Sequence, residues 1–168
     1  MHKRGIFKLN ITFNTAITVA LLTAMISFIV QYFFKYYDNR NHSQSIKKAI
    51  ISEIAATLKI IEKRNYREWL QSCVDDLESG KSKLVLGSIE QQQNLFPVYK
   101  ANIDKIGVLN ANLASNIVMF YALLESVLID TKSDGLLNNP EFSSLDAFIE
   151  TLKILDDAIF LGKEIENT

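Results

Sequence analysis

The pattern of apolar and polar residues divides this chain into two parts. From Leu9 to Phe34 there is no charged residue in 26 positions, and further aromatic residues follow. At ~1.5 Å per residue a helix of this length spans ~39 Å, more than the ~30 Å hydrocarbon core of a bilayer. Aromatic residues at its end are typical of a membrane interface. The pattern predicts a transmembrane helix over residues 11–34, after a basic tail over 1–10 and before a connector over 35–44.

A secretory signal peptide is the alternative interpretation of this segment, because Lys3, Arg4 and Lys8 resemble the basic start of such peptides. The apolar stretch is long for a signal peptide, and bulky aromatic residues stand where a cleavage site needs small ones. We therefore favour an uncleaved anchor. Charge does not decide its orientation, since three basic residues precede the span, and residues 35–48 contain four basic residues and one acidic residue.

One face of the predicted anchor carries small and hydrogen-bonding side chains at helical spacing. The face comprises Ala16, Ala20, Ala24, Ser27 and Gln31. Small residues let membrane helices approach closely, so this stripe is a candidate for pairing two copies of the chain. The alternative is that such residues are simply common in membrane helices. The span contains no ionisable side chain, which disfavours a pore.

After the anchor, apolar residues recur every three or four positions, as they do in amphipathic helices. Ser43 is the candidate cap of a first helix that contains Ile46, Ile50 and Ile54. A second helix over 66–77 ends before a Ser-Gly pair and either continues the first helix or folds back.

The second half of the chain contains further helix signals. Asn110 is a candidate cap for a helix with a continuous apolar face. Ser143, spaced with Asp146 as in a capping box, or Pro140 opens a last helix, and Gly162 is expected to end it. No segment alternates as a strand does. The chain is predicted to be all-α, with one N-terminal transmembrane helix followed by an antiparallel bundle of four to five helices over residues 45–165.

Composition and charge narrow the function classes. One cysteine and two histidines are too few for a disulfide scaffold or the usual zinc sites. Residues 1–48 have a net charge of +6, whereas the remaining 120 residues have a net charge of −7. Basic residues that flank an apolar segment indicate a lipid bilayer as partner. The acidic remainder disfavours nucleic acid.

The sequence offers no residues suited to catalysis. The pairs Asp75-Asp76 and Asp156-Asp157 are adjacent in helices, so the side chains of each pair point about 100° apart and are expected to be solvated. Cys73 lies on an apolar helical side and is interpreted as a small core residue. We therefore expect no enzymatic activity, no catalytic residue, no cofactor and no metal.

The most distinctive segment is FPVYKANIDKIGVLNANLASNIVMFY, which we call the 96–121 box. Pro97 suits a first helical turn, and Gly107 is predicted to close the short helix in the left-handed conformation. Asn102 is expected to hydrogen-bond the backbone freed at Gly107. The favoured interpretation is a packing device for one helix-turn-helix; the alternative is an exposed patch, including Asp104 and Lys105, that recognises a partner.

The box resembles a widespread, uncharacterised bacterial family of small single-pass membrane-anchored helical proteins. The matching positions are Phe96, Pro97, Tyr99, Asn102, Ile106, Gly107, Leu109, Leu113, Ala114, Ile117, Val118, Phe120 and Tyr121. The segment from Ile46 to Leu70 is similar to the helix that follows the membrane anchor in that family. The resemblance implies a bacterial inner-membrane protein, and many members look cytoplasm-facing. It attaches no catalytic role to the box.

Together these observations predict a non-enzymatic interaction module at the bacterial inner membrane, with its bundle in the cytoplasm. Its expected partners are the lipid bilayer, an unknown protein and a second copy of the chain paired through the anchor. Two alternatives belong to other classes. One is a membrane-acting effector that oligomerises through the anchor, and the other is an extracytoplasmic sensor bundle with a ligand pocket between its helices.

Overall fold

The computed structural model describes the backbone of residues 3–81 and 95–168, and the side chains of residues 21–81 and 95–168. Most of the described residues are helical, and the described part of the chain contains no strand. The chain divides into two compact units, residues 1–44 and 45–168. The predicted all-α class is therefore confirmed for the described residues.

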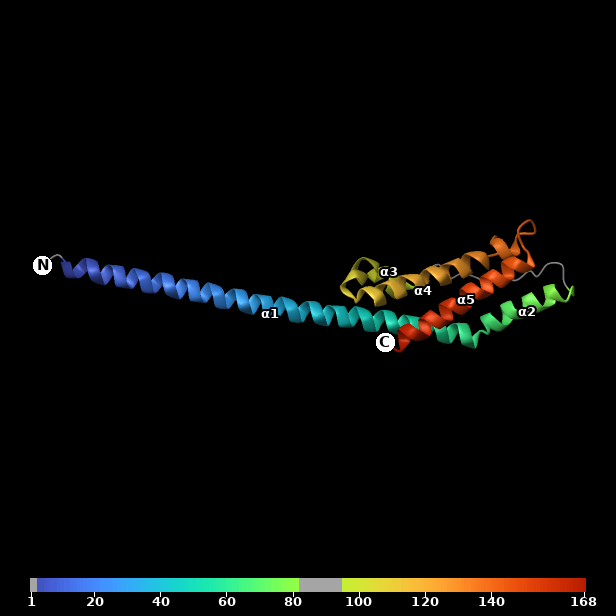
Figure 1. Cartoon of the computed structure of the whole chain (residues 1–168), viewed down its shortest axis with the longest axis horizontal. Coiled ribbons are helices and arrows are strands. Elements are labelled where there is room, and N and C mark those ends of the chain that lie inside the picture. Colours follow the sequence, from blue (N-terminus) through green and yellow to red (C-terminus); the bar gives the residue numbers. More distant parts are fainter. Residues whose placement is uncertain (1–2, 82–94) are drawn as a thin grey trace. The chain divides into compact units, whose positions relative to one another are not determined.

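Five α-helices and two 3-10 helices make up the described chain (Figure 1). In chain order they are α1 (Lys3–Lys63), α2 (Tyr66–Glu78), α3 (Pro97–Asn102), η1 (Ile103–Val108), α4 (Ala111–Asp130), η2 (Leu136–Asn138) and α5 (Leu145–Glu166). The predicted cap at Ser43 is wrong, because helix α1 continues through this residue. The separation of α2 from α1 is at Asn65, a non-glycine residue with a left-handed φ of 51°.

Contacts within the second unit give the directions of its helices. Helix α5 is antiparallel to α4, since Thr151 bonds Asp130 and Gly162 lies against Phe120. It is also antiparallel to α1, because Lys47 contacts Thr168 at one end and Leu58 lies against Gly162 further along. Helices α1 and α4 consequently run in the same direction (Figure 1). The predicted antiparallel arrangement holds for α5 but not for this pair.

The core of the second unit is formed by apolar residues at helical spacing on four helices, and most of the positions that the sequence predicts are among them. On α1 the buried positions are Ile46, Ile50, Ile54 and Ile61; on α4 they are Leu113, Ile117, Phe120, Tyr121, Leu124 and Val127. Helix α5 contributes Phe148, Leu152, Leu155, Ala158 and Ile165, and α2 contributes Leu70, Cys73 and Val74. The interpretation of Cys73 as a small core residue is confirmed.

Local signals place the start of α4 correctly and that of α5 one residue early. The side chain of Asn110 accepts a hydrogen bond from the Asn112 N–H at 3.0 Å, as a capping residue does. The cap of α5 is Ser144, whose Oγ accepts from the Ala147 N–H at 3.2 Å. The predicted cap at Ser143 is therefore wrong by one residue, a usual error where two serines are adjacent.

Two glycines do not end helices as predicted. Gly107 lies inside η1 and lacks a positive φ, so the left-handed closure expected there is wrong. Gly162 lies inside α5, which continues to Glu166. A Cβ at Gly162 would be only 2.7 Å from the ring of Phe120 and 3.1 Å from Leu58. This glycine therefore serves close packing among α1, α4 and α5 instead of termination.

One helix in the described part of the chain, α4, is long and apolar enough to cross a membrane by length and composition. Its six buried residues identify it as the core helix of the second unit. The predicted span over 11–34 lies partly outside the residues whose side chains are described. Within the described part, residues 21–37 include twelve exposed large apolar or aromatic side chains.

Candidate functional site

The 96–121 box is built around a carboxylate from α1, Glu53. Its Oε1 accepts the Val98 N–H at 2.8 Å, and its Oε2 accepts the Tyr99 N–H at 2.9 Å. The same Oε2 accepts the Tyr121 hydroxyl at 2.9 Å. Because Pro97 has no N–H, Val98 and Tyr99 hold the first free donors of α3. Glu53 therefore caps α3 from another helix and ties it to α4.

The backbone at Phe96 makes this capping geometry accessible. Phe96 precedes α3 with φ 58° and ψ 53°, a left-handed conformation that costs energy for a residue with a side chain. The residue is also buried, and its ring lies edge-on to that of Tyr121 at a centroid distance of 5.0 Å. Burial of the ring and the Glu53 cap together offset the backbone strain.

Two tyrosine rings stack at the centre of the box. The rings of Tyr99 and Tyr121 are 3.9 Å apart at their centroids with an interplanar angle of 17°. The ring of Phe120 meets Tyr121 edge-on at 5.1 Å. The stacked pair joins α3 to α4, whereas the ring of Phe120 also lies against Gly162 of α5.

The electrostatics of the cluster keep both phenols protonated at neutral pH. Burial raises the pKa of Tyr121 far above its usual value, and the hydrogen bond to Glu53 and its negative charge raise it further. Burial, and then the negative charge of Glu125, raise the pKa of Tyr99. The Tyr121 hydroxyl thus remains a donor to the carboxylate and is not a candidate base at neutral pH.

The structure separates the box residues into a packed set and an exposed set. Phe96, Tyr99, Ile106, Phe120 and Tyr121 are buried, and Asn102 is half-buried. Pro97 and Gly107 are exposed, as are the neighbouring residues Asp104 and Lys105.

Asn102 does not make the predicted bond near Gly107, because its Nδ2 donates to Val98 O of its own helix at 2.8 Å. Asparagine side chains readily bond backbone groups within their own turn, and this local bond takes the place of the predicted one.

Glu53 is the functional residue that sequence reasoning missed. It lies three residues after Ile50 and directly before Ile54, so it falls within the buried stripe of α1. An acidic residue in such a stripe is the signal that was available. Its hydrogen-bond partners are 45 to 68 positions away in the chain. Spacing rules for residues within one helix cannot predict such partners.

The candidate anchor-pairing stripe lies on α1. Its described members Ala24, Ser27 and Gln31 are exposed. The side chains of Ala16 and Ala20 lie outside the described residues. All five positions belong to one unbroken helix, so their spacing places them along one face.

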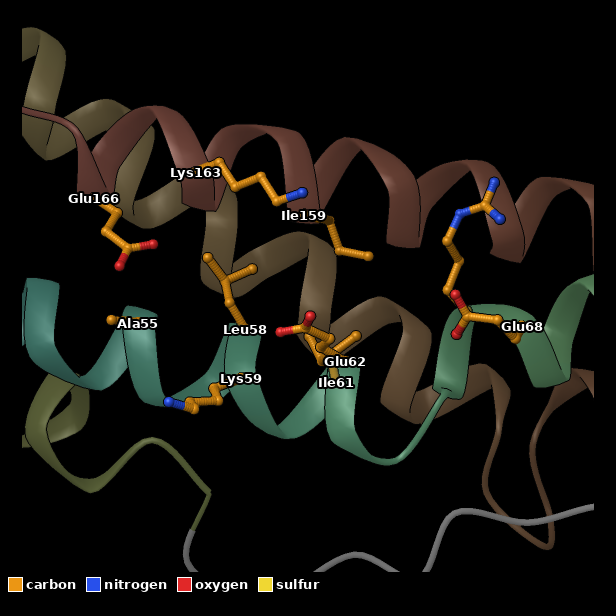
Figure 2. Close-up of a pocket in the computed structure, with 10 residues that line it drawn as sticks. Ala55, Leu58, Lys59, Ile61, Glu62, Glu68, Ile159, Lys163 and Glu166 are labelled. Atoms are coloured by element: carbon orange, nitrogen blue, oxygen red, sulfur yellow. The ribbon is translucent and has the colours of Figure 1, made fainter.

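A cavity of about 400 Å³ opens between α1, α2 and α5 (Figure 2). Its apolar lining includes Leu58, Ile61 and Ile159, and its charged lining is Lys59, Glu62, Arg67, Glu68, Lys163 and Glu166. In Figure 2, the side chain of Glu166 reaches from α5 toward α1, and Lys163 runs along α5. The lining thus combines an apolar floor with charges of both signs.

Arg67, one of the residues that line this cavity, forms an ion pair with Asp156. Arg67 Nε donates to Asp156 Oδ1 at 2.7 Å, and its Nη2 donates to Oδ2 at 2.9 Å. The hydrogen bond and the charge of Asp156 raise the pKa of Arg67. Asp156 is therefore paired and does not have the purely solvated environment predicted for it. The bidentate geometry joins α2 to α5.

Among the residues whose side chains are described, no three His, Cys, Asp or Glu residues are arranged to hold a metal ion. Comparison of the chain with models of protein families, with curated proteins and with solved structures finds no match. The site is therefore interpreted from its own geometry.

Proposed function

We propose that this chain is a single-pass, membrane-anchored helical protein without enzymatic activity, whose bundle binds other proteins at the bacterial inner membrane. The observation that carries the proposal is the exposed apolar surface of α1 over residues 21–37. Twelve large apolar or aromatic side chains are exposed there, among them Phe28, Phe33 and Phe34.

The size of this surface favours lipid as its environment. Covering one large apolar side chain contributes ~1.5–3 kcal/mol, so twelve of them contribute on the order of 20 kcal/mol. Because many of these residues are neighbours in the sequence, they lie on all sides of the helix instead of along one stripe. A helix that is apolar on all sides is suited to hydrocarbon, whereas a bundle helix needs only one apolar face.

Membrane extraction tests the anchor. We expect the full chain to stay in the membrane pellet after an alkaline wash, because α1 spans the bilayer. Replacing Leu22, Ile26 and Ile29 with Arg introduces charges at the span and should release the protein. The matched control places three Arg residues at the exposed positions Ser52, Asn112 and Ser133, which should leave the protein in the pellet. Recovery of the unaltered chain in the soluble fraction would contradict the proposal.

Reporter fusions after Thr168 test the orientation. The family resemblance favours a cytoplasmic bundle, so a reporter that works only in the cytoplasm should be active. Activity of an external reporter alone would refute this orientation.

The outer face of α4 supports an interaction role. Val118, Met119 and Ile129 are about half exposed on this helix, and exposed apolar residues of this kind are typical of protein-binding surfaces. A photo-crosslinking residue at position 119 should form one discrete protein adduct in cells. The same residue at the exposed position 153 on α5 should not form it. Identical adduct patterns at both positions would argue against α4 as the binding face.

The sensor hypothesis is the second candidate, and the cavity between α1, α2 and α5 favours it. Its volume of about 400 Å³ is in the range of small-molecule pockets, and its mixed lining suits a small molecule with charges of both signs. This candidate requires the bundle to lie outside the cytoplasm. Activity of the external reporter alone would therefore support this candidate, and inactivity of that reporter would contradict it.

A further inference from the structure

We infer that η1 and the residues beside it form a surface that contacts an anionic lipid bilayer; this inference rests on the proposed membrane anchor. We call this surface the lipid-facing tip and define it as Lys100, Ile103, Lys105 and Val108. The partner is the headgroup region of the membrane that holds the anchor.

Two apolar side chains on η1 are exposed to solvent. Ile103 is 54% exposed and Val108 is 50% exposed, although both belong to a short helix at the border of the core. Five of the six residues of η1 are exposed, and Ile106 is the buried exception. Exposed apolar side chains of this kind are what an interfacial segment buries at the headgroup boundary when basic residues accompany them.

The charges of the tip complement those of anionic headgroups. Lys100 and Lys105 are exposed beside the two apolar residues, and Lys48 is exposed on α1. Lys47 is not counted, because its Nζ lies 3.5 Å from Thr168 O. Asp104 is the acidic residue within η1, so residues 100–108 contain two lysines against one acidic residue, although the chain beyond residue 48 is acidic. Lysine beside an exposed apolar residue suits anionic headgroups, with the ammonium in water and the apolar side chain in lipid.

The tip lies at one end of the second unit. Lys47 contacts Thr168, and Glu53 holds α3, so the first turns of α1 in this unit lie beside the end of α5 and beside α3. The tip comprises the end of α3 and η1, and it precedes the start of α4. It therefore belongs to the same end of the unit as Ser45, where the chain arrives from the anchor (Figure 1).

The reach of the chain joins this end to the membrane. Tyr37 is the last residue of the exposed aromatic run, and Ser45 begins the second unit. Even fully extended, the eight intervening steps span at most ~29 Å. Connectivity alone therefore keeps Ser45 within ~29 Å of the end of the exposed aromatic run.

Depth-dependent fluorescence quenching tests the tip in the full chain. The chain, with Cys73→Ala, is reconstituted into phosphatidylcholine–phosphatidylglycerol vesicles that contain brominated lipid. An environment-sensitive fluorophore is attached at Val108→Cys, at Phe142→Cys as a control at the opposite end, or at Ile29→Cys in the anchor. We expect quenching at positions 29 and 108 and none at 142. Single Trp69 emission, compared across the variants, reports whether the bundle is folded.

Each outcome distinguishes the tip from the anchor. Quenching at 29 without quenching at 108 overturns the tip and leaves the proposed function intact. No quenching at 29 overturns both. Equal quenching at 108 and 142 also overturns the tip, because the bundle would then lie along the membrane without an oriented end.

Charge variants test the lipid class. The pair Lys100→Glu and Lys105→Glu should abolish quenching at position 108, as should high salt or vesicles of phosphatidylcholine alone. The matched control is Lys153→Glu on the exposed side of α5, which should leave the quenching unchanged. Quenching that is unaffected by the lysine pair and by lipid charge would overturn the assignment to anionic lipid.

Discussion

Replacement of Glu53 by alanine is the most informative perturbation of this fold. The variant removes the acceptor of three hydrogen bonds, those from the Val98 N–H, the Tyr99 N–H and the Tyr121 hydroxyl. A hydrogen bond to a charged group contributes ~1.5–3 kcal/mol, and three bonds to one acceptor are not additive. The site is partly buried, so water replaces some of the lost contacts. We expect a loss of ~3 kcal/mol in the free energy of unfolding.

This loss is large enough to measure by urea denaturation. With an m-value of ~1–3 kcal/mol per molar, a change of ~3 kcal/mol moves the urea midpoint by at least ~1 M. The detergent-solubilised full chain is suitable, because its single tryptophan, Trp69, lies on α2 against the core and reports on the bundle. The anchor contains no tryptophan and does not contribute to this signal.

Two further variants separate the cap from a general effect of charge. Glu62→Ala removes a carboxylate from an exposed position of the same helix and should change stability by no more than ~0.5 kcal/mol. Tyr121→Phe removes one of the three bonds and should show a positive coupling with Glu53→Ala in a double-mutant cycle. Hydrogen exchange at the Val98 and Tyr99 amides should quicken in Glu53→Ala. If Glu53→Ala unfolds at the urea concentration of Glu62→Ala, the capping argument is refuted.

Three other perturbations test packing and titration. Gly162→Val should lower the free energy of unfolding by ~1–3 kcal/mol in a urea titration, because its Cβ would meet the buried ring of Phe120. Gly107→Ala should change it by less than ~1 kcal/mol, since nothing lies within 4 Å of a Cβ there. Equal urea midpoints for the two variants would contradict this. Burial raises the pKa of the Cys73 thiol, so a thiol reagent should label the native chain slowly and the urea-unfolded chain fast, and equal rates would contradict the core assignment. Burial also raises the pKa of Asp130, so the native state binds its proton more tightly than the unfolded state does. The stability that the protonated form confers is then lost as pH rises from the usual carboxyl pKa through the folded pKa. Asp130→Asn should therefore raise the free energy of unfolding, relative to the unaltered chain, more at neutral pH than in acid. Urea denaturation at both pH values tests this difference.

The elements that the sequence predicts correctly depend on local chemistry. Asn110 caps α4 through a bond to a residue two positions away, and Pro97 begins α3 because its ring suits a first helical turn. The apolar stripes of α1, α4 and α5 are buried as their spacing predicts. In each case the information lies within one or two turns of helix.

The elements that sequence reasoning misses depend on distant partners or on uncommon backbone conformations. Asn65 and Phe96 adopt the left-handed conformation without being glycine, and no local pattern indicates this. Glycine misleads in the opposite direction, because Gly162 is required for close packing and not for a turn. Glu53 was missed because its role is defined by α3 and α4, which lie far along the chain.

The packing of α1 against helices that follow much later has a consequence for the order of events during synthesis. Leu58 lies against Gly162, and Glu53 bonds Tyr121, so the apolar face of α1 is completed only after α4 and α5 have left the ribosome. At ~5–20 residues per second, roughly 70 to 100 further residues take on the order of 5–20 s. During this interval Ile46, Ile50 and Ile54 have no native cover. The nascent chain therefore exposes the apolar face of an amphipathic helix until α5 has been synthesised. Binding of this face to a chaperone or to the membrane surface would cover it during that interval.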